Sequence, residues 1–199
     1  MNVPVFSPFC NKGQNGFSLI EVFIALCILS SGLLGLAAMQ LQAKQRHLDA
    51  LQRASAVLLA QDLLERMYSN PHAATLYVLD AVDASQRPAI EPQPDCRHTI
   101  CSSTQLARHD LWEWQSLLHG INALEPSQAA QGGLRHAIAC VHVLDGWVQI
   151  NLAWRGMQRI HTQNTEPCGI GSGHFGEHDE LRQTLVIRSF IADSRAASL

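Results

Sequence analysis

Glu21 is the residue whose position most clearly points to a chemical role. It is the one charged residue among the 25 residues from Phe17 to Leu41, of which 18 are apolar. A carboxylate inside hydrocarbon costs on the order of 3 kcal/mol on insertion scales, so it is rarely found there without a purpose. Pairing with a cation would offset part of that cost. The chemistry that we expect of Glu21 is therefore ion pairing.

The cysteines are the second set of residues with chemical potential. Cys10 lies near the start of the chain, and Cys27 lies inside the apolar run, where it acts as a small hydrophobe. The remaining four are Cys96, Cys101, Cys140 and Cys168. An even number beyond an apolar segment suggests two disulfides in an oxidising compartment. Three pairings are open. We favour Cys96–Cys101, which closes a short loop, and Cys140–Cys168, which ties a predicted hairpin to the loop before the last strand.

Metal binding is the alternative for the same region. Cys96-x-His98-x-x-Cys101 and His174-x-x-x-His178 contain ligand-type residues, and ten histidines is a high count. The spacing matches no standard zinc pattern, however, and oxidised cysteines cannot ligate. The acidic turn Glu177–Glu180 lacks the regular ligand spacing of a calcium loop. We predict no metal and no cofactor.

Motifs for catalysis are missing from the sequence. It contains no glycine-rich phosphate loop, no Gly-x-Ser-x-Gly elbow and no His-Glu-x-x-His helix. The sequence therefore favours a protein that is not an enzyme.

The apolar run is long enough to cross a bilayer, since about 20 residues suffice. A secretory signal peptide is the rival interpretation, with a cleavage site at Ser30-Ser31-Gly32. Against it, residues 1–16 contain only one basic residue, Lys12, and Glu21 lies near the start of the run.

Gly16-Phe17-Ser18-Leu19-Ile20-Glu21, followed by the apolar run, resembles the class III signal of type IV pilins and pseudopilins. The resemblance implies that residues 1–16 are a leader, which prepilin peptidase removes by cutting between Gly16 and Phe17. It further implies N-methylation of Phe17. Glu21 would then pair with the terminal amine of a neighbouring subunit and set the axial register of a filament.

The helical pattern continues beyond the apolar half, residues 17–41, into an amphipathic half, residues 42–69. Leu48, Leu51, Leu58 or Leu59, Leu63 and Met67 recur at helical spacing and predict an apolar stripe. Asn70-Pro71 predicts the end of the helix. The sequence Leu-Leu-Glu-Arg-Met at residues 63–67 is similar to the end of this helix in PilV-type minor pilins.

The rest of the chain divides into two regions. Residues 70–135 predict a variable αβ-loop region, with a helix over Leu106–Leu118 that buries Trp112 and Trp114. Residues 136–199 predict an antiparallel sheet with a disulfide-tied loop. Its strands are 135–143, 147–154 and 182–191, and Asp145-Gly146 predicts a hairpin between the first two.

Composition and charge agree with two unlike parts. The mean hydropathy is +0.01 and charged residues make up only 16 % of the chain, yet 30 of the 31 charges lie outside residues 17–41. A net charge of −3 gives no reason to expect nucleic-acid binding. A wholly soluble cytosolic enzyme is therefore disfavoured.

These observations predict an α+β, pilin-like fold with a long N-terminal helix packed on a C-terminal antiparallel sheet. The resemblance implies a minor pilin of type IV pilus biogenesis, in a priming or tip complex. Its expected partners are prepilin peptidase, other minor pilins and the major pilin. It would cross the inner membrane once, with its head in the periplasm, and enter the pilus after assembly. The alternatives are a minor pseudopilin of type II secretion and a ligand- or DNA-binding pilin.

Overall fold

The computed structural model describes residues 16–83, 90–120, 133–160 and 166–192. In chain order the elements are α1 (Leu19–Ser69), η1 (Pro71–Tyr77), β1 (Leu79–Val82), α2 (Ser103–His119), β2 (Ile138–Leu144), β3 (Trp147–Arg155) and β4 (Arg182–Phe190). The chain divides into two compact units, residues 1–43 and residues 44–199. We call the second unit the head and describe each unit by itself.

The first unit contains the apolar part of α1. The helix begins after Ser18, whose carbonyl accepts hydrogen bonds from the backbone N–H groups of Glu21 and Val22. Glu21 lies in the first turn, where the positive end of the helix dipole stabilises a carboxylate. The large apolar side chains of this part are exposed, among them Phe23, at 64 %, and Leu34, at 72 %. By length and composition α1 is able to cross a membrane.

In the head, the later part of α1 contributes one face to the core. Its buried residues are Ala56, Ala60, Leu63 and Met67. The predicted stripe is therefore wrong at Leu48 and Leu51, which are exposed, whereas Leu59 packs against the core at the next position of the stripe. Two of the four buried positions are occupied by alanine. The helix ends at Ser69, before Pro71, as predicted.

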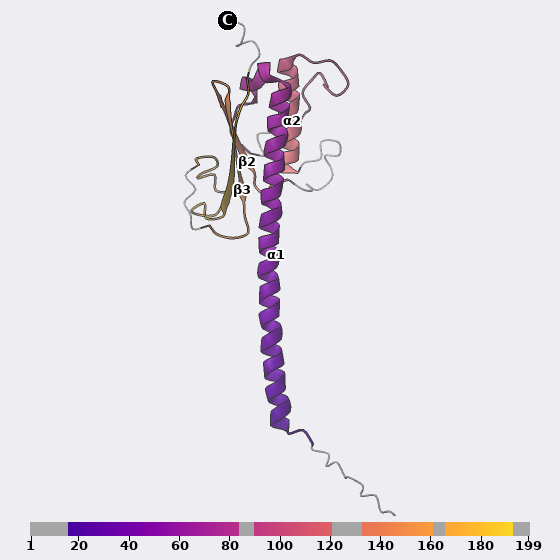
Figure 1. Cartoon of the computed structure of the whole chain (residues 1–199), viewed down its shortest axis with the longest axis vertical. Coiled ribbons are helices and arrows are strands. Elements are labelled where there is room, and N and C mark those ends of the chain that lie inside the picture. Colours follow the sequence, from indigo (N-terminus) through magenta and orange to yellow (C-terminus); the bar gives the residue numbers. More distant parts are fainter. Residues whose placement is uncertain (1–15, 84–89, 121–132, 161–165, 193–199) are drawn as a thin grey trace, which may run out of the picture. The chain divides into compact units, whose positions relative to one another are not determined.

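Helix α2 has well-defined ends. Ser102 and Gln105 form a reciprocal capping box at its start, and Gly120 ends it in a left-handed conformation. Trp114 is buried against α1, and its indole N–H donates to the carbonyl of Leu59 over 2.8 Å. Figure 1 shows α2 and the sheet alongside the C-terminal part of α1.

The sheet is a four-stranded antiparallel meander in the order β1-β2-β3-β4. β2 and β3 are joined by the tight turn expected from the sequence, with φ of 50° at Asp145 and 80° at Gly146. β1 is a further strand, which lies in the predicted variable region of residues 70–135. Its pairing with β2 is irregular between Leu79 and Val82. The α+β, pilin-like fold class is confirmed.

The two faces of the sheet have different coverings. Alternate residues of β3, Val148, Ile150, Leu152 and Trp154, lie in the core shared with α1 and α2. We call this the inner face. On the opposite, outer face, Ile138, Cys140 and Ala153 pack with Cys168 and Phe175 in a second apolar cluster. The loop that contains Cys168 and Phe175 therefore covers part of the outer face.

Candidate functional site

The N-terminal motif lies at the start of α1. Gly16 and Phe17 precede the helix, and the Phe17 side chain is 80 % exposed. Phe17 and Glu21 line one shallow hollow of about 400 Å³ together with Val22, Ala25, Leu26 and Leu29. The helix begins two residues later than expected, so Phe17 lies outside its first turn. Residues 1–15 of the expected leader lie outside the described residues.

Glu21 is exposed at the surface of this helix. Among the residues that the structure describes, none places a basic group within ion-pair distance of its carboxylate. The Gly16 backbone is open as well, with no atom within 4 Å of the place where a Cβ would stand. The motif therefore presents an accessible peptide bond and an accessible carboxylate, which is what peptidase cleavage and intersubunit pairing would need.

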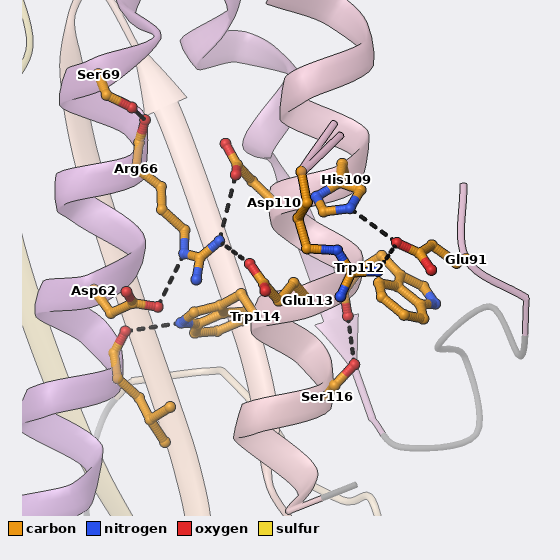
Figure 2. A network of polar contacts seen from close by, with 12 residues as sticks. Asp62, Arg66, Ser69, Glu91, His109, Asp110, Trp112, Glu113, Trp114 and Ser116 are labelled. Atoms are coloured by element: carbon orange, nitrogen blue, oxygen red, sulfur yellow. Dashed lines mark hydrogen bonds and ion pairs between the residues drawn. The ribbon is translucent and has the colours of Figure 1, made fainter. Parts of the chain in front are cut away.

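A polar network in the head joins α1 to α2 around Arg66 (Figure 2). Its Nε donates to Asp62 on the same helix over 3.0 Å. Its Nη1 donates to Asp110 over 3.3 Å and to Glu113 over 2.7 Å, both on α2. Burial alone would lower the pKa of Arg66, but the contacts with Glu113 and Asp62 hold it above the ordinary value. One guanidinium thus connects three carboxylates on two helices.

Tyr77 extends this network into η1. Its hydroxyl donates to the second carboxylate oxygen of Asp110 over 2.6 Å, and both side chains are buried. Asn70, at the end of α1, donates to the Tyr77 hydroxyl and to the carbonyl of Ser103. Burial, and then the hydrogen bond to Asp110, raise the pKa of Tyr77 well above its ordinary value. The network therefore fixes the end of α1, η1 and α2 relative to one another.

A second polar cluster lies beside the Cys96–Cys101 disulfide. The buried His109 places Nε2 at 3.1 Å from Glu91 and at 3.5 Å from Asp95. These three residues have the spacing of a metal site, but Arg97 forms ion pairs with both carboxylates. Arg97 donates hydrogen bonds to Asp95, and the one from its backbone N–H contributes most to lowering the pKa of Asp95. The cluster fastens the disulfide loop to α2, and both of its carboxylates are in contact with Arg97.

The second disulfide, Cys140–Cys168, fastens a loop to the outer face of β2. The loop is also held by Arg182, whose buried guanidinium donates to the carbonyls of Glu166 and Cys168. Burial lowers the pKa of Arg182 below its ordinary value. Both disulfides join the pairs that the sequence analysis favours.

The alternative metal ligands are not brought together as a site. Cys96 and Cys101 are bonded to each other and offer no thiolate, and the His98 side chain is 82 % exposed. His174 stacks instead on His136, with ring centroids 5.5 Å apart. Burial, and then the charges of His174, Arg155 and Arg135, lower the pKa of His136.

The sequence analysis missed the residues of the Arg66 network. No sequence motif points to Tyr77 or Asp110, which lie in η1 and α2. The only sequence signal was the Leu-Leu-Glu-Arg-Met motif, which contains Arg66 but says nothing of partners 44 residues away.

The chain matches the model of a known protein family. The model of the Tt1218-like family, described as type IV pilin Tt1218, matches residues 38–112. This stretch runs from α1 to the middle of α2 and includes Arg66, Tyr77 and Asp110. No curated protein and no solved structure matches the chain significantly.

The fold and the match define the class of protein. A long N-terminal helix, apolar over its first half, leads into a head with a four-stranded antiparallel sheet. This fold, together with the match over residues 38–112, supports a type IV pilin-like protein. The matched family is one of structural proteins, so the match supports a pilin role.

Proposed function

We propose that the chain is a minor pilin, made as a prepilin and incorporated into a type IV pilus through its N-terminal helix. In this proposal prepilin peptidase cuts between Gly16 and Phe17, and the new terminal amine of Phe17 is methylated. The mature chain then waits in the inner membrane, with its head in the periplasm, until it joins other minor pilins and the major pilin.

The observation that carries the proposal is the spacing of Gly16, Phe17 and Glu21 at the start of an apolar helix. This motif lies outside residues 38–112, which the pilin family model matches. The motif and the family match are therefore separate observations, and both support a pilin. The Leu-Leu-Glu-Arg-Met stretch supports a PilV-type minor pilin in particular.

The features of the two units support the proposed location. The first unit exposes apolar side chains on every side of α1, which suits lipid before assembly and a bundle of helices after it. The head contains two disulfides, and disulfides persist in oxidising compartments such as the periplasm. A single-pass anchor with a periplasmic head would account for both the exposed apolar helix and the two disulfides.

Glu21 supplies the proposed driving force for docking. A carboxylate in apolar surroundings is costly, and a cationic amine from a neighbouring subunit would offset that cost. Because the pair forms at one axial position only, it would also select the register of the incoming helix.

The test of this function is recovery of the chain in sheared surface filaments from cells that carry its native gene. We expect Glu21→Gln to abolish recovery in the filament fraction while the membrane fraction keeps normal amounts. Glu65→Gln is the matched control, because Glu65 is an exposed glutamate of the same helix. Equal recovery of both variants would contradict the role of Glu21. Absence of the wild-type chain from pili, with loss of protein secretion on deletion, would indicate a secretion pseudopilin instead.

A further inference from the structure

β4 is the last strand of the described sheet, and one of its edges pairs with no strand that the structure describes. It pairs only with β3 among the strands that the structure describes. At the two ends of the strand, the carbonyl of Leu181 accepts from the N–H of Gly156 and the N–H of Ile191 donates to the carbonyl of Gly146, both on the β3 side. Since backbone groups alternate along a strand, those of the even-numbered residues point away from β3. The N–H and C=O groups of Val186 and Arg188 therefore face outward.

The ends of this edge are already occupied. The N–H of Arg182 donates to the carbonyl of Asp179, and the carbonyl of Phe190 accepts from the Tyr68 hydroxyl. The open stretch is thus centred on Val186 and Arg188. Leu185 and Ile187, on either side of Val186, are only partly buried, although both pack against the core. An edge with open backbone groups and half-buried apolar side chains is a template for a further strand.

The outer face next to this edge has an exposed apolar surface. Leu144, Trp147 and Phe190 form one cross-strand row and are 72 %, 60 % and 49 % exposed. The Trp147 and Phe190 rings are in edge contact, with centroids 5.5 Å apart. The row before it is His142, Gln149 and Arg188. A hollow of about 380 Å³ is lined by most residues of these two rows and by Val148, but not by Phe190.

Arg188 gives the surface its charge. Its side chain is 66 % exposed, its Nε donates to Gln149 over 2.8 Å, and its Nη2 lies 3.9 Å from Glu166. The guanidinium is therefore held in place by Gln149 while one side of it remains open to a carboxylate. A second copy of β4 would bring another arginine and no acidic residue, because the strand is Arg-Gln-Thr-Leu-Val-Ile-Arg-Ser-Phe.

We propose that the open edge of β4 binds an extended acidic segment of another subunit, which adds to the sheet as a further antiparallel strand. The acidic residue would lie opposite Arg188, with apolar residues two positions away on each side, opposite Val186 and Phe190. Cross-strand pairs of this kind stabilise neighbouring strands, and the backbone groups supply the affinity. This inference rests on the proposed function only in naming the partner as another pilin subunit.

The direct test is amide hydrogen exchange on the full chain in detergent micelles. The probe is the acetylated and amidated peptide Thr-Val-Thr-Glu-Thr-Val-Thr, which places one glutamate between two valines on the same face. We expect the amides of Val186 and Arg188 to exchange quickly in the free protein and slowly with the peptide. The amides of Leu185 and Ile187, which face β3, are expected to be protected in both states.

Three control peptides separate the contribution of the glutamate charge from that of the backbone hydrogen bonds. Replacing the glutamate by lysine is expected to weaken binding about fivefold, in line with the size of cross-strand charge effects. N-methylation of the glutamate and valine amides, which would face β4, is expected to abolish binding. N-methylation of the threonine amides, which would face solvent, is expected to leave it intact. Equal binding of all N-methylated peptides would overturn strand addition in favour of side-chain docking alone.

Two protein variants test the same contact from the other side. Val186→Pro removes an N–H that faces away from β3, so it blocks the edge and spares the β3 ladder, with Val186→Thr as its control. Arg188→Glu is expected to reverse the preference, so that the lysine peptide binds better than the glutamate peptide. This second variant keeps the test decisive if the proline variant does not fold.

Protection of Val186 and Arg188 that rises with protein concentration, without peptide, would assign the edge to a second copy and overturn the acidic partner. Lack of protection with any peptide would also overturn the proposal. Neither result depends on processing or on filament assembly, so the proposed function would stand or fall separately.

Discussion

The Arg66 network offers the sharpest test of what holds the head together. Arg66→Met keeps most of the packing of the side-chain stem but removes the guanidinium. Asp110 and Glu113 on α2 and Asp62 on α1 then lose their shared cation. Removing one partner of a buried ion pair costs about 3–5 kcal/mol. Because the Arg66 side chain is 20 % exposed and that of Glu113 is 34 % exposed, we expect the lower end, about 3 kcal/mol.

Urea unfolding of the oxidised full chain in micelles measures this cost. Trp114 and Trp154 are buried in the head, so tryptophan fluorescence reports its unfolding. With a slope of about 2 kcal/mol per molar urea, a loss of about 3 kcal/mol lowers the midpoint by about 1.5 M. Arg53→Met is the matched control, because Arg53 is exposed on the same helix, and its effect is expected to stay within about 0.5 kcal/mol.

A double-mutant cycle separates the ion pair from the general effect of the substitution. Asp110→Asn removes one of the charges that Arg66 neutralises, so the double variant is expected to cost less than the sum of the two single variants. We expect a coupling of at least about 1 kcal/mol. An additive double variant, or an Arg66→Met variant as stable as the Arg53→Met control, would refute the role assigned to this network.

Three further predictions follow from single residues of the head. Tyr77→Phe removes a phenol hydroxyl whose pKa is raised by burial. Above about pH 10 the unfolded wild type loses this proton first, so wild-type stability falls by about 1.4 kcal/mol per pH unit relative to the variant. His136 has a lowered pKa, so the unfolded state binds more protons below about pH 6.5 and stability falls as the pH falls. His136→Asn, which tolerates the φ of 48° there, is expected to reduce this acid loss. Gln52 donates to the Gly133 carbonyl and accepts from the Arg135 N–H, so Gln52→Leu is expected to cost about 1–2 kcal/mol in urea unfolding.

Each of these has a result that would count against it. An alkaline slope that is the same in wild type and Tyr77→Phe would show that another group titrates there. An unchanged acid slope in His136→Asn would remove the histidine stack as its source. Gln61 is an exposed glutamine of α1, and a Gln61→Leu variant as destabilised as Gln52→Leu would place the effect in helix propensity.

Local patterns predicted most of the secondary structure. The end of α1 follows from Asn70-Pro71, and the hairpin follows from Asp145-Gly146, because both signals act through the backbone of adjacent residues. The start of α2 lies three residues before the predicted Leu106, and the capping box of Ser102 and Gln105 is a local signal that accounts for it. β1 has only four residues, with an irregular pairing, so its sequence contains no sustained alternation to find.

Packing explains what the sequence could not predict. The stripe of large leucines is a reasonable apolar face, yet in the head Ala56 and Ala60 are fully buried while Leu48 and Leu51 are exposed. Burial at these positions depends on the neighbouring elements, which the period of a single helix does not contain. The partners of Arg66 likewise come from α2, so only the fold brings them together.

The N-terminal motif, in contrast, could be found in the sequence because its residues lie within a few positions of each other. Gly16, Phe17 and Glu21 were identified from the sequence alone, and the structure adds their exposure at the start of α1. Their proposed chemistry acts on partners outside the chain, so cleavage, methylation and pairing remain predictions for experiment.

The central claim is that this chain is processed as a prepilin, and the N-terminus of the mature protein tests it most directly. The measurement is N-terminal sequencing and intact mass of the chain from cells with and without prepilin peptidase. We predict a start at Phe17 with the added mass of one methyl group when the peptidase is present, and the uncut chain when it is absent. A start at Leu33, or the same N-terminus in both strains, would contradict the account.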